Sequence, residues 1–420
     1  MNMFKIIFVI VTICLFFSAC TQKKNSVGFE PGNEPKIIEF DYNYFDDCLS
    51  YEDSVGNYYN NNKLIVGNYY SSNYLNEAHI LLKNISLPDT ISALESEVII
   101  KLQKTGNYNF ADISTATLKF GRLLQNWKEN EATWLNATDT TYWSGASGFS
   151  ESDYELLEIN NIAVVDDSIY LEIPNELLLD WVENDSTNFG LTIFSEQDDS
   201  FLELLSAEAE SVFLTFSYSI AEADTVIEYN ESFTSDTFIV STDEVFQRFN
   251  GELKLSNIQP IKMFMQFNIS DSVFINLENS GIHNSDDYRR MTINQAELIL
   301  SPVEESDYPL DGSINVTPYL VLKDSLDLED SSTPLLTGED YEYFYDGTSS
   351  DSLSTDQLKI NLKYIIQFIT SGERDNNGIM IKSINENRDF LNINFADVNY
   401  SDVEKRPKLK ILYTPPYLDE

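Results

Sequence analysis

Two stretches of the chain, 169–193 and 358–381, repeat one pattern of hydrophobic and polar positions. Each begins with apolar residues at every second position and continues with a short apolar segment, LLLDW or YIIQF. A polar turn with Asn and Gly and a second apolar strand follow. Alternation with a period of two is typical of a β-strand with one buried face. The turn glycines, Gly190 and Gly378, lie 188 residues (378 − 190) apart, so the pattern predicts two tandem domains of one fold.

Other strand-like segments occur in the same order around both copies of this unit. The corresponding pairs are 79–86 with 261–270, 93–102 with 293–300, 113–124 with 313–324, and 211–219 with 406–414. Many short strands joined by long loops favour a β-sandwich or jelly roll, and an ordered internal repeat indicates duplication. We therefore expect an all-β protein with two tandem β-sandwich (jelly-roll) domains at 45–220 and 223–415, the second being a diverged copy.

The N-terminus has the pattern of a secretory signal peptide. Residues 1–19 contain one positive charge, an apolar run and small residues directly before Cys20, as such signals do. The FSAC ending resembles a lipobox, although Phe17 stands where Leu is usual. We expect Cys20 to be lipidated and to anchor the chain in a membrane; an ordinary cleaved signal is the alternative. Residues 20–44 are expected to be a tether. This predicts an outer-membrane lipoprotein of the cell envelope, on its periplasmic or its surface face.

Composition and charge narrow the classes of partner. The chain is 42% hydrophobic and 13% aromatic, which suffices for packed cores, and its formal net charge is −43. Phosphate backbones repel such a surface, so nucleic acid is excluded as a partner. Sulfated or uronate glycans are disfavoured for the same reason unless calcium bridges them. With only two histidines, a His-based catalytic triad or a zinc site would be hard to build. No catalytic motif occurs, so we expect that the protein is not an enzyme.

Calcium is the one cofactor that the sequence leaves open. Acidic clusters occur at 166–167, 198–199, 286–287 and 375–378, and calcium prefers oxygen ligands of this kind. None of them has the spacing of an EF-hand, and the last is better explained as a hairpin turn, because Asn-Gly readily adopts positive φ. The sequence does not choose the residues of a calcium site.

The strand motifs resemble those of the jelly-roll family named for its DNRLRE signature, which includes carbohydrate-binding modules. The matching positions are Leu64-Val66-Gly67, His79-Leu81-Leu82 with Leu87-Pro88, Trp127-Glu129 with Thr133-Trp134, Trp181 with Asn188-Gly190-Leu191, and Ser206-Glu208 leading to Tyr218. His79 replaces the arginine of the family pattern. The resemblance covers 45–220, whereas 223–415 keeps the strand order but lacks the W-x-E…T-W pair. It implies a jelly-roll fold and either carbohydrate binding or a spacer role.

Several conspicuous side chains are expected to be structural. Trp127, Trp134 and Trp181 stand on or beside strands, where large aromatics mostly belong to the core. His79 is interpreted as a packed or edge residue of a strand rather than a ligand, and Cys48 as a small apolar residue of the first strand. Because Cys48 stands alone after the leader, no disulfide is expected within the mature fold.

Two aromatic loops are the candidate binding sites. The segments 141–149 (TYWSGASGF) and 339–347 (EDYEYFYDG) are expected at the same place in both domains. Sugars present C–H faces that pack on aromatic rings, and carboxylates accept their hydroxyl protons. The candidate glycan-binding residues are Tyr142, Trp143, Tyr341, Tyr343 and Tyr345, with Asp340, Glu342 and Asp346 as acceptors. The alternative is that these rings fold back and cover the end of the sandwich.

Three classes of function remain. The first is a non-catalytic, envelope-anchored lipoprotein that recognises a neutral glycan. The second is a structural or protein-interaction lipoprotein whose domains act as spacers or assemble with an envelope protein. The third is a glycan-cleaving enzyme, which needs two carboxylates about 5–9.5 Å apart across a cleft. Exposure of Trp143 and Tyr343 around a concavity favours the first class, and burial of both favours the second.

Overall fold

The computed structural model describes residues 34–417 with short gaps. The residues left out of this range are 53–56, 60, 72–73, 84–85, 109, 111, 146, 222–224, 243–250, 258–259, 304–312, 325–335, 337, 344–348, 353–356 and 387–391. The predicted signal peptide, the lipidated Cys20 and most of the predicted tether therefore lie outside the described residues. Within the described part of the chain, no helix is long and apolar enough to cross a membrane.

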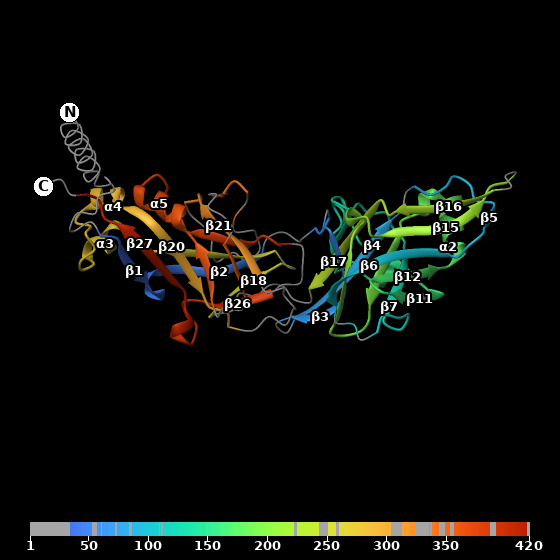
Figure 1. The fold of residues 1–420 in the computed structure, drawn as a ribbon, viewed down its shortest axis with the longest axis horizontal. Helices are drawn as coiled ribbons and strands as arrows, with labels where there is room; N and C mark the ends of the chain where they lie inside the picture. The colour runs from blue at the N-terminus through green and yellow to red at the C-terminus, as the bar shows by residue number, and fades with distance from the viewer. Residues whose placement is uncertain are drawn as a thin grey trace, which may run out of the picture.

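Antiparallel strands build two lobes, which lie end to end in Figure 1. The N-terminal lobe contains β3 (Lys63–Ser71), β4 (Tyr74–Lys83), β5 (Ala93–Leu94), β6 (Val98–Tyr108), β7 (Leu118–Leu123), β8 (Asn136–Thr138), β9 (Thr141–Tyr142), β10 (Tyr154–Leu157), β11 (Asn161–Val165), β12 (Ser168–Ile173), β13 (Leu191–Ser195), β14 (Ser200–Leu205), β15 (Phe213–Ser219), β16 (Val226–Ser232) and β17 (Ser235–Thr242).

The C-terminal lobe contains the remaining strands. They are β1 (Lys36–Phe40), β2 (Phe45–Glu52), β18 (Glu252–Ser256), β19 (Ile261–Phe267), β20 (Thr292–Leu300), β21 (Ser313–Val321), β22 (Tyr341–Glu342), β23 (Ser349–Ser352), β24 (Leu358–Asn361), β25 (Ile379–Ser383), β26 (Asn392–Ala396) and β27 (Lys408–Thr414). The predicted all-β sandwich class is confirmed.

Helices are few and short. The α-helices are α2 (Asn175–Glu183), α3 (Asp271–Asn276), α4 (Ser285–Arg290) and α5 (Lys363–Ser371). Single 3-10 turns are η1 (Tyr42–Tyr44), η2 (Glu151–Asp153), η3 (Asp185–Thr187), η4 (Ala207–Ala209) and η5 (Val403–Lys405). The two longest helices of the described residues, α2 and α5, contain the apolar segments LLLDW and YIIQF of the repeated unit. The unit is thus a strand, a helix and a second strand in both copies.

The two lobes have the same strand order. In the N-terminal lobe, β16, β15, β6 and β12 are neighbours in that order, as β1, β27, β20 and β24 are in the C-terminal lobe. The facing sheets run β10-β7-β13-β4-β3-β14 and β22-β21-β25-β19-β18-β26, and β17 pairs with β4 as β2 pairs with β19. The strand correspondence expected from the sequence therefore holds in the order of the strands.

The first strands of the chain belong to the last lobe. β1 pairs with β27, from Lys36 opposite Tyr413 to Phe40 opposite Leu409, and β2 pairs with β19. In the same positions of the N-terminal lobe stand β16 and β17, which pair with β15 and β4. The expected boundaries assign these strands differently: β1 to the tether, β2 to the domain at 45–220, and β16 and β17 to the domain at 223–415. The expected tether 20–44 is wrong for the part that forms β1 and η1, because the buried ring of Phe40 fastens this segment to the core.

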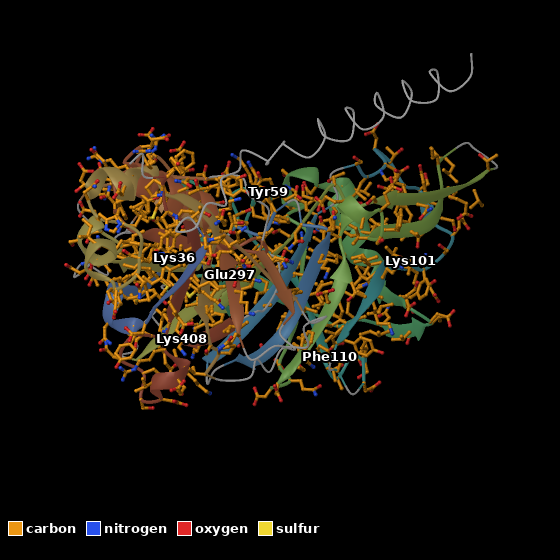
Figure 2. All side chains as sticks on the ribbon, turned by 60° about the vertical axis from the view of Figure 1, so that its left-hand side comes forward. Lys36, Tyr59, Lys101, Phe110, Glu297 and Lys408 are labelled. Atoms are coloured by element: carbon orange, nitrogen blue, oxygen red, sulfur yellow. The ribbon has the colours of Figure 1, made fainter. Side chains whose placement is uncertain are left out.

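Each lobe has its own large cluster of buried hydrophobic side chains. The N-terminal cluster includes Trp181 from α2 and Leu191 from β13, and the C-terminal cluster includes Phe40, Phe274 and Ile365. Side chains alternate between the core and solvent along the strands, as a half-buried sheet requires. On the outer side of the four-stranded sheet, the alternation leaves half-buried charged residues on β20 and β27, which Figure 2 labels as Glu297 and Lys408.

Candidate functional site

The first predicted aromatic loop is part of a small core. Tyr142 ends the short strand β9 and is 74% exposed, but Trp143 beside it is only 3% exposed. The indole N–H of Trp143 donates a hydrogen bond to the backbone oxygen of Thr133 at 2.8 Å, and its ring meets Phe149 edge-on at 4.9 Å. The expected exposure is therefore wrong for Trp143, because the loop folds back over the sheet and buries its largest ring.

The other tryptophans lie where the sequence predicts them. Trp127 and Trp181 are buried, and Trp134 is half-buried against the same outer cluster as Trp143. The indole N–H of Trp127 donates to the backbone oxygen of Phe189 at 2.9 Å. His79, also predicted to be packed, stacks on Phe194 with ring centroids 4.9 Å apart. The segment between β7 and β10 thus covers one outer face of the N-terminal lobe with aromatic side chains.

The second predicted loop forms a tyrosine cluster on the C-terminal lobe. Tyr341 lies in β22, which pairs with the end of β21, and its ring meets Tyr319 edge-on at 5.2 Å. The ring of Tyr343 lies 5.5 Å from Tyr319 and is 41% exposed. We call Tyr319, Tyr341 and Tyr343 the tyrosine face. Tyr345 and Asp346 of the predicted site lie outside the described residues.

The tyrosine face exists because one glycine of the N-terminal lobe is replaced in the C-terminal lobe. Gly121 of β7 pairs with Thr192, the second residue of β13, and Tyr319 of β21 pairs with Met380, the second residue of β25. The ring of Tyr154 lies directly over Gly121, where an added Cβ would be 2.5 Å from it. Tyr319 fills this space in the C-terminal lobe, so Tyr341 packs against a ring instead of against the sheet.

The two predicted loops therefore do not occupy equivalent places. Tyr341 pairs with Val321 on β21 as Tyr154 pairs with Leu123 on β7. Tyr142 instead pairs with Asn136 in the separate two-stranded sheet of β8 and β9. The structure brings together Tyr341 and Tyr343 and leaves Tyr142 and Trp143 in the other lobe.

Charged groups surround the tyrosine face. Lys382 lies with its Nζ 6.0 Å from the ring centroid of Tyr319 and 3.4 Å from a carboxylate oxygen of Glu386. Lys262 lies 3.8 Å from the other oxygen of Glu386. Burial is the main cause that raises the pKa of Tyr319 above its ordinary value. The face therefore offers rings, a hydroxyl donor, an ammonium group and a carboxylate. Sequence reasoning missed both lysines, because only strand pairing places them beside the tyrosines.

A hollow of about 210 Å³ opens next to β22. It is lined by Val321, Leu322, Gly372, Glu373, Arg374, Asp375 and Asn377. Arg374 joins it to the tyrosine face, since its guanidinium donates to Glu342 Oε2 at 3.1 and 3.2 Å, and Glu342 stands between Tyr341 and Tyr343. The hollow is smaller than the about 300–1,000 Å³ of typical small-molecule pockets.

The side chains that line the hollow are two acids, one amide, one arginine and two aliphatic groups. Of the acids beside the rings, Glu342 is engaged by Arg374. No protein-family model matches the chain, and no curated protein matches it significantly.

Proposed function

We propose that the protein is a non-catalytic lipoprotein of the cell envelope that binds a neutral glycan at the tyrosine face. The observation that carries the proposal is the contact of three half-exposed tyrosine rings, at centroid distances of 5.2 and 5.5 Å. Flat aromatic rings with a polar tip combine apolar contact area with a hydrogen-bonding group. The C–H faces of a sugar would lie on Tyr343, and its hydroxyls would meet Lys382, Glu386 and the polar lining of the hollow.

Charge supports a neutral ligand. The chain carries a formal net charge of −43, so a polyanion would be repelled before it reached the surface. Both lysines beside the tyrosine face form ion pairs with Glu386, which offsets one of their two positive charges. The face therefore presents donors and acceptors with at most a small local positive charge. The lipid anchor at Cys20, the outer-membrane location and the kinship with the DNRLRE-signature family are parts of this proposal that rest on sequence motifs.

A structural role is favoured for the N-terminal lobe by one observation. Trp143 is buried and its indole N–H is bonded to the backbone of Thr133, so the most obvious sugar-stacking ring of this lobe is not available to a ligand. We propose that this lobe is a spacer, or a platform for an envelope protein, while the C-terminal lobe binds.

Replacement of Tyr343 by Ala is expected to weaken glycan binding by roughly 10- to 150-fold. Loss of one aromatic contact costs about 1.5–3 kcal/mol, which corresponds to this change in Kd. The ring is 41% exposed, so the fold should tolerate its removal. The measurement is a screen of the purified chain on an array of neutral glycans, followed by calorimetric titration of the best ligand into both proteins.

Tyr142→Ala is the matched control for this experiment, since it removes a tyrosine ring of the N-terminal lobe that is 74% exposed. It should bind as the unmodified chain does. Equal binding by Tyr343→Ala, or a loss with Tyr142→Ala alone, would contradict the proposed site.

A further inference from the structure

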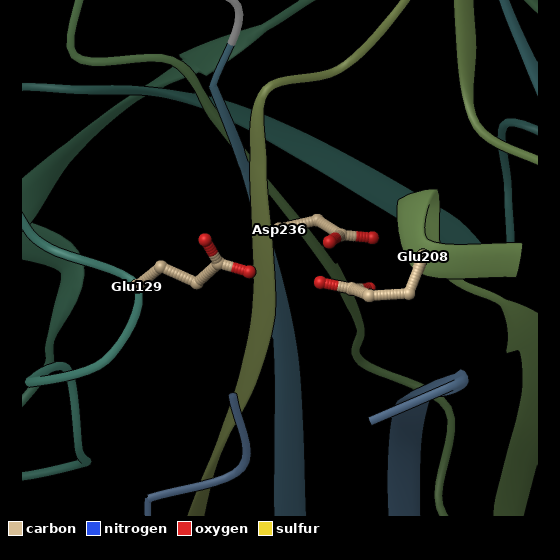
Figure 3. A group of neighbouring side chains, drawn as sticks. All are labelled: Glu129, Glu208 and Asp236. Atoms are coloured by element: carbon tan, nitrogen blue, oxygen red, sulfur yellow. The ribbon is translucent and has the colours of Figure 1, made fainter. Parts of the chain in front are cut away.

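Three carboxylates from distant parts of the N-terminal lobe converge on one point. Glu129 lies in the segment between β7 and β8, Glu208 lies in η4, and Asp236 is the second residue of β17. One oxygen from each lies within 4.8 Å of the others. Figure 3 shows the side chains of Glu129 and Glu208 reaching toward Asp236 from two sides of the strand. The sequence places these acids 79 (208 − 129) and 28 (236 − 208) residues apart, so only the fold brings them together.

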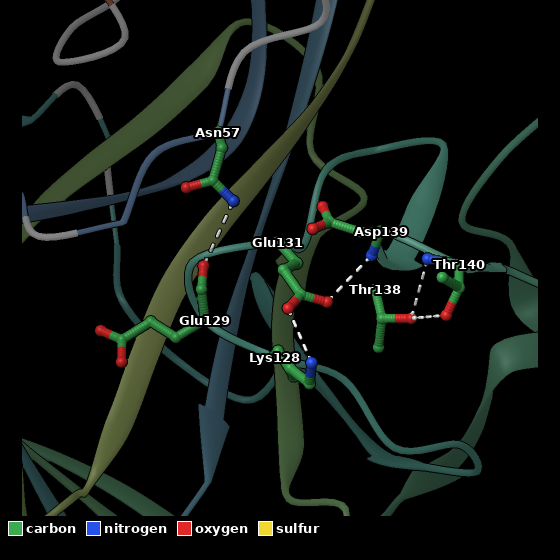
Figure 4. Close-up of polar contacts among 7 residues, drawn as sticks. All are labelled: Asn57, Lys128, Glu129, Glu131, Thr138, Asp139 and Thr140. Atoms are coloured by element: carbon green, nitrogen blue, oxygen red, sulfur yellow. Dashed lines mark hydrogen bonds and ion pairs between the residues drawn. The ribbon is translucent and has the colours of Figure 1, made fainter.

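The turn that carries Glu129 is held in place by hydrogen bonds of its own. The side-chain amide of Asn57 donates to the backbone oxygens of Glu129 and Ala132, at 3.2 and 2.7 Å. The nearest basic residue in the sequence, Lys128, is engaged elsewhere, because its Nζ lies 2.7 Å from Glu131 (Figure 4). Figure 4 shows the Glu129 carboxylate pointing away from this pair. The turn therefore fixes the position of Glu129 without neutralising its charge.

Asp236 provides a second observation that points to a ligand. Its side chain is only 2% exposed and is aimed at Glu208 in Figure 3. Oδ2 accepts a hydrogen bond from the backbone N–H of Ala207 at 2.7 Å. Oδ1 is buried and has no hydrogen-bond partner among the described residues. Ionised carboxylates only accept hydrogen bonds, so neither glutamate can satisfy this oxygen unless a proton or a cation lies between them.

The charges of the cluster are not balanced by any ion pair that the described part of the chain shows. Burial raises the pKa of Asp236, opposed by the hydrogen bond from Ala207, and the charges of Glu208 and Glu129 raise it further. Burial, together with the charge of Glu208, also raises the pKa of Glu129. Three like charges in this space cost free energy, which a bound cation would recover.

We propose that Glu129, Glu208 and Asp236 form a calcium-binding site. All donor atoms are carboxylate oxygens, which hard cations prefer, and no histidine or cysteine takes part. Oxygens on opposite sides of Ca²⁺, each about 2.4 Å from it, lie about 4.8 Å apart, and the three oxygens fit within that span. The exposed side of the cluster, at Glu208, leaves room for the waters that would complete six to eight ligands.

The site would fasten β17 to the N-terminal lobe. Asp236 pairs with Leu82 on β4, and the chain that follows β17 leads to β18 in the C-terminal lobe. In the C-terminal lobe, Cys48 of β2 takes the place that Asp236 has in the N-terminal lobe. Asp236 pairs with Leu82, and Leu82 pairs with the first residue of β13. Cys48 pairs in the same way with Met265, and Met265 pairs with the first residue of β25. Because a thiol stands here in place of a carboxylate, we expect calcium to stabilise the N-terminal lobe alone. The proposal is independent of glycan binding.

The test is titration of CaCl₂ into the mature chain by calorimetry, together with thermal unfolding in EDTA and in 10 mM CaCl₂. Extracellular calcium modules have Kd values of about 0.1–1 mM, so 10 mM calcium should raise the Tm of the N-terminal lobe by about 3–10 °C. Asp236→Asn keeps the shape of the side chain and should lose at least ten-fold in calcium affinity together with the rise in Tm. Asp198→Asn removes the same charge from an exposed acidic cluster and should change neither.

Asp236→Asn also separates a lost site from a damaged fold. In EDTA its Tm should equal or exceed that of the unmodified chain, because a repelling charge is removed. If it does not fold, Glu208→Gln at the exposed end of the cluster replaces it in the same comparison. The proposal is overturned if the unmodified chain shows neither heat nor a rise in Tm up to 10 mM calcium. It is equally overturned if the folded variant responds to calcium as the unmodified chain does.

Discussion

Gly190→Ala is expected to destabilise the N-terminal lobe by at least about 3 kcal/mol. Gly190 has φ = +86°, and an added Cβ would stand 2.0 Å from the backbone oxygen of Leu82. Left-handed backbone costs other residues about 1–3 kcal/mol. The clash is with backbone, so β13 must also move away from β4, with which Leu191 pairs. Urea unfolding checks this, with peptides of the two lobes followed separately by hydrogen exchange and mass spectrometry.

Two further glycines make the comparison informative. Gly106→Ala adds a Cβ with nothing within 4 Å, so its free energy of unfolding should stay within about 0.5 kcal/mol of the original. Gly378 occupies the equivalent turn with φ = +94°, but its nearest contact is the ring of Phe264 at 2.8 Å. Gly378→Ala should therefore destabilise the C-terminal lobe, and by less than Gly190→Ala destabilises the other. If Gly190→Ala left the free energy of unfolding unchanged, this explanation of the repeated turn would be contradicted.

Phe40→Ala is expected to destabilise the C-terminal lobe by about 3–5 kcal/mol, the usual cost of emptying a core position of Phe. Phe40 is 1% exposed and its ring lies 5.1 Å from Tyr44 and 5.5 Å from Phe274. The change removes the ring that holds β1 to the core, so the edge of β27 should also exchange its amide hydrogens faster. The measurement is the same lobe-resolved urea unfolding.

Ile37→Ala in the same strand is the control, because Ile37 is 65% exposed. It should alter stability by no more than about 0.5 kcal/mol. If residues 20–44 were only a tether, both variants would be neutral. A small effect of Phe40→Ala would therefore argue against the place of β1 in the C-terminal lobe.

The repeated unit could be predicted because its signals are local. Alternation of apolar and polar residues defines the strands β12 and β24. Gly190 and Gly378 have positive φ, which only glycine adopts without strain. The helices α2 and α5 were expected only as apolar segments. The hairpin turn expected at 375–378 is wrong, because the segment joins the helix α5 to the strand β25. Asn376 and Asn377 donate there to the backbone oxygens of Phe267 and Leu322.

The partners of the end strands could not be predicted from the pattern. β1 and β16 occupy the same edge position in the sheets of the two lobes. Their sequences, KIIEF and VIEYNES, do not determine which lobe each strand joins. Register and hydrophobic alternation specify a position in a sheet, but both lobes offer the same position. The choice depends on the short connection from β15 to β16, which keeps β16 beside its neighbour in the sequence.

The candidate sites were predictable only in part. Tyr341 and Tyr343 were found because aromatic residues stand out in an acidic loop, whereas the burial of Trp143 depends on how its segment folds over β4 and β7. Glu129 and Glu208 occur within motifs of the sequence, but Asp236 carries no signal of its own. Convergence of acids from three elements is a property of the tertiary fold and leaves no spacing to recognise.

The central claim is that the first strand of the chain completes the last lobe, and a cross-link tests it most directly. Glu39 and Lys410 are paired, exposed residues of β1 and β27, so Glu39→Cys with Lys410→Cys should form a disulfide. Both double variants also carry Cys48→Ser, so that the natural thiol cannot compete for the new cysteines. Peptide mapping after mild oxidation identifies the link. The account predicts linkage of 39 with 410 and none in the pair Glu39→Cys with Thr215→Cys, on β15. Linkage of 39 with 215, and not with 410, would contradict it.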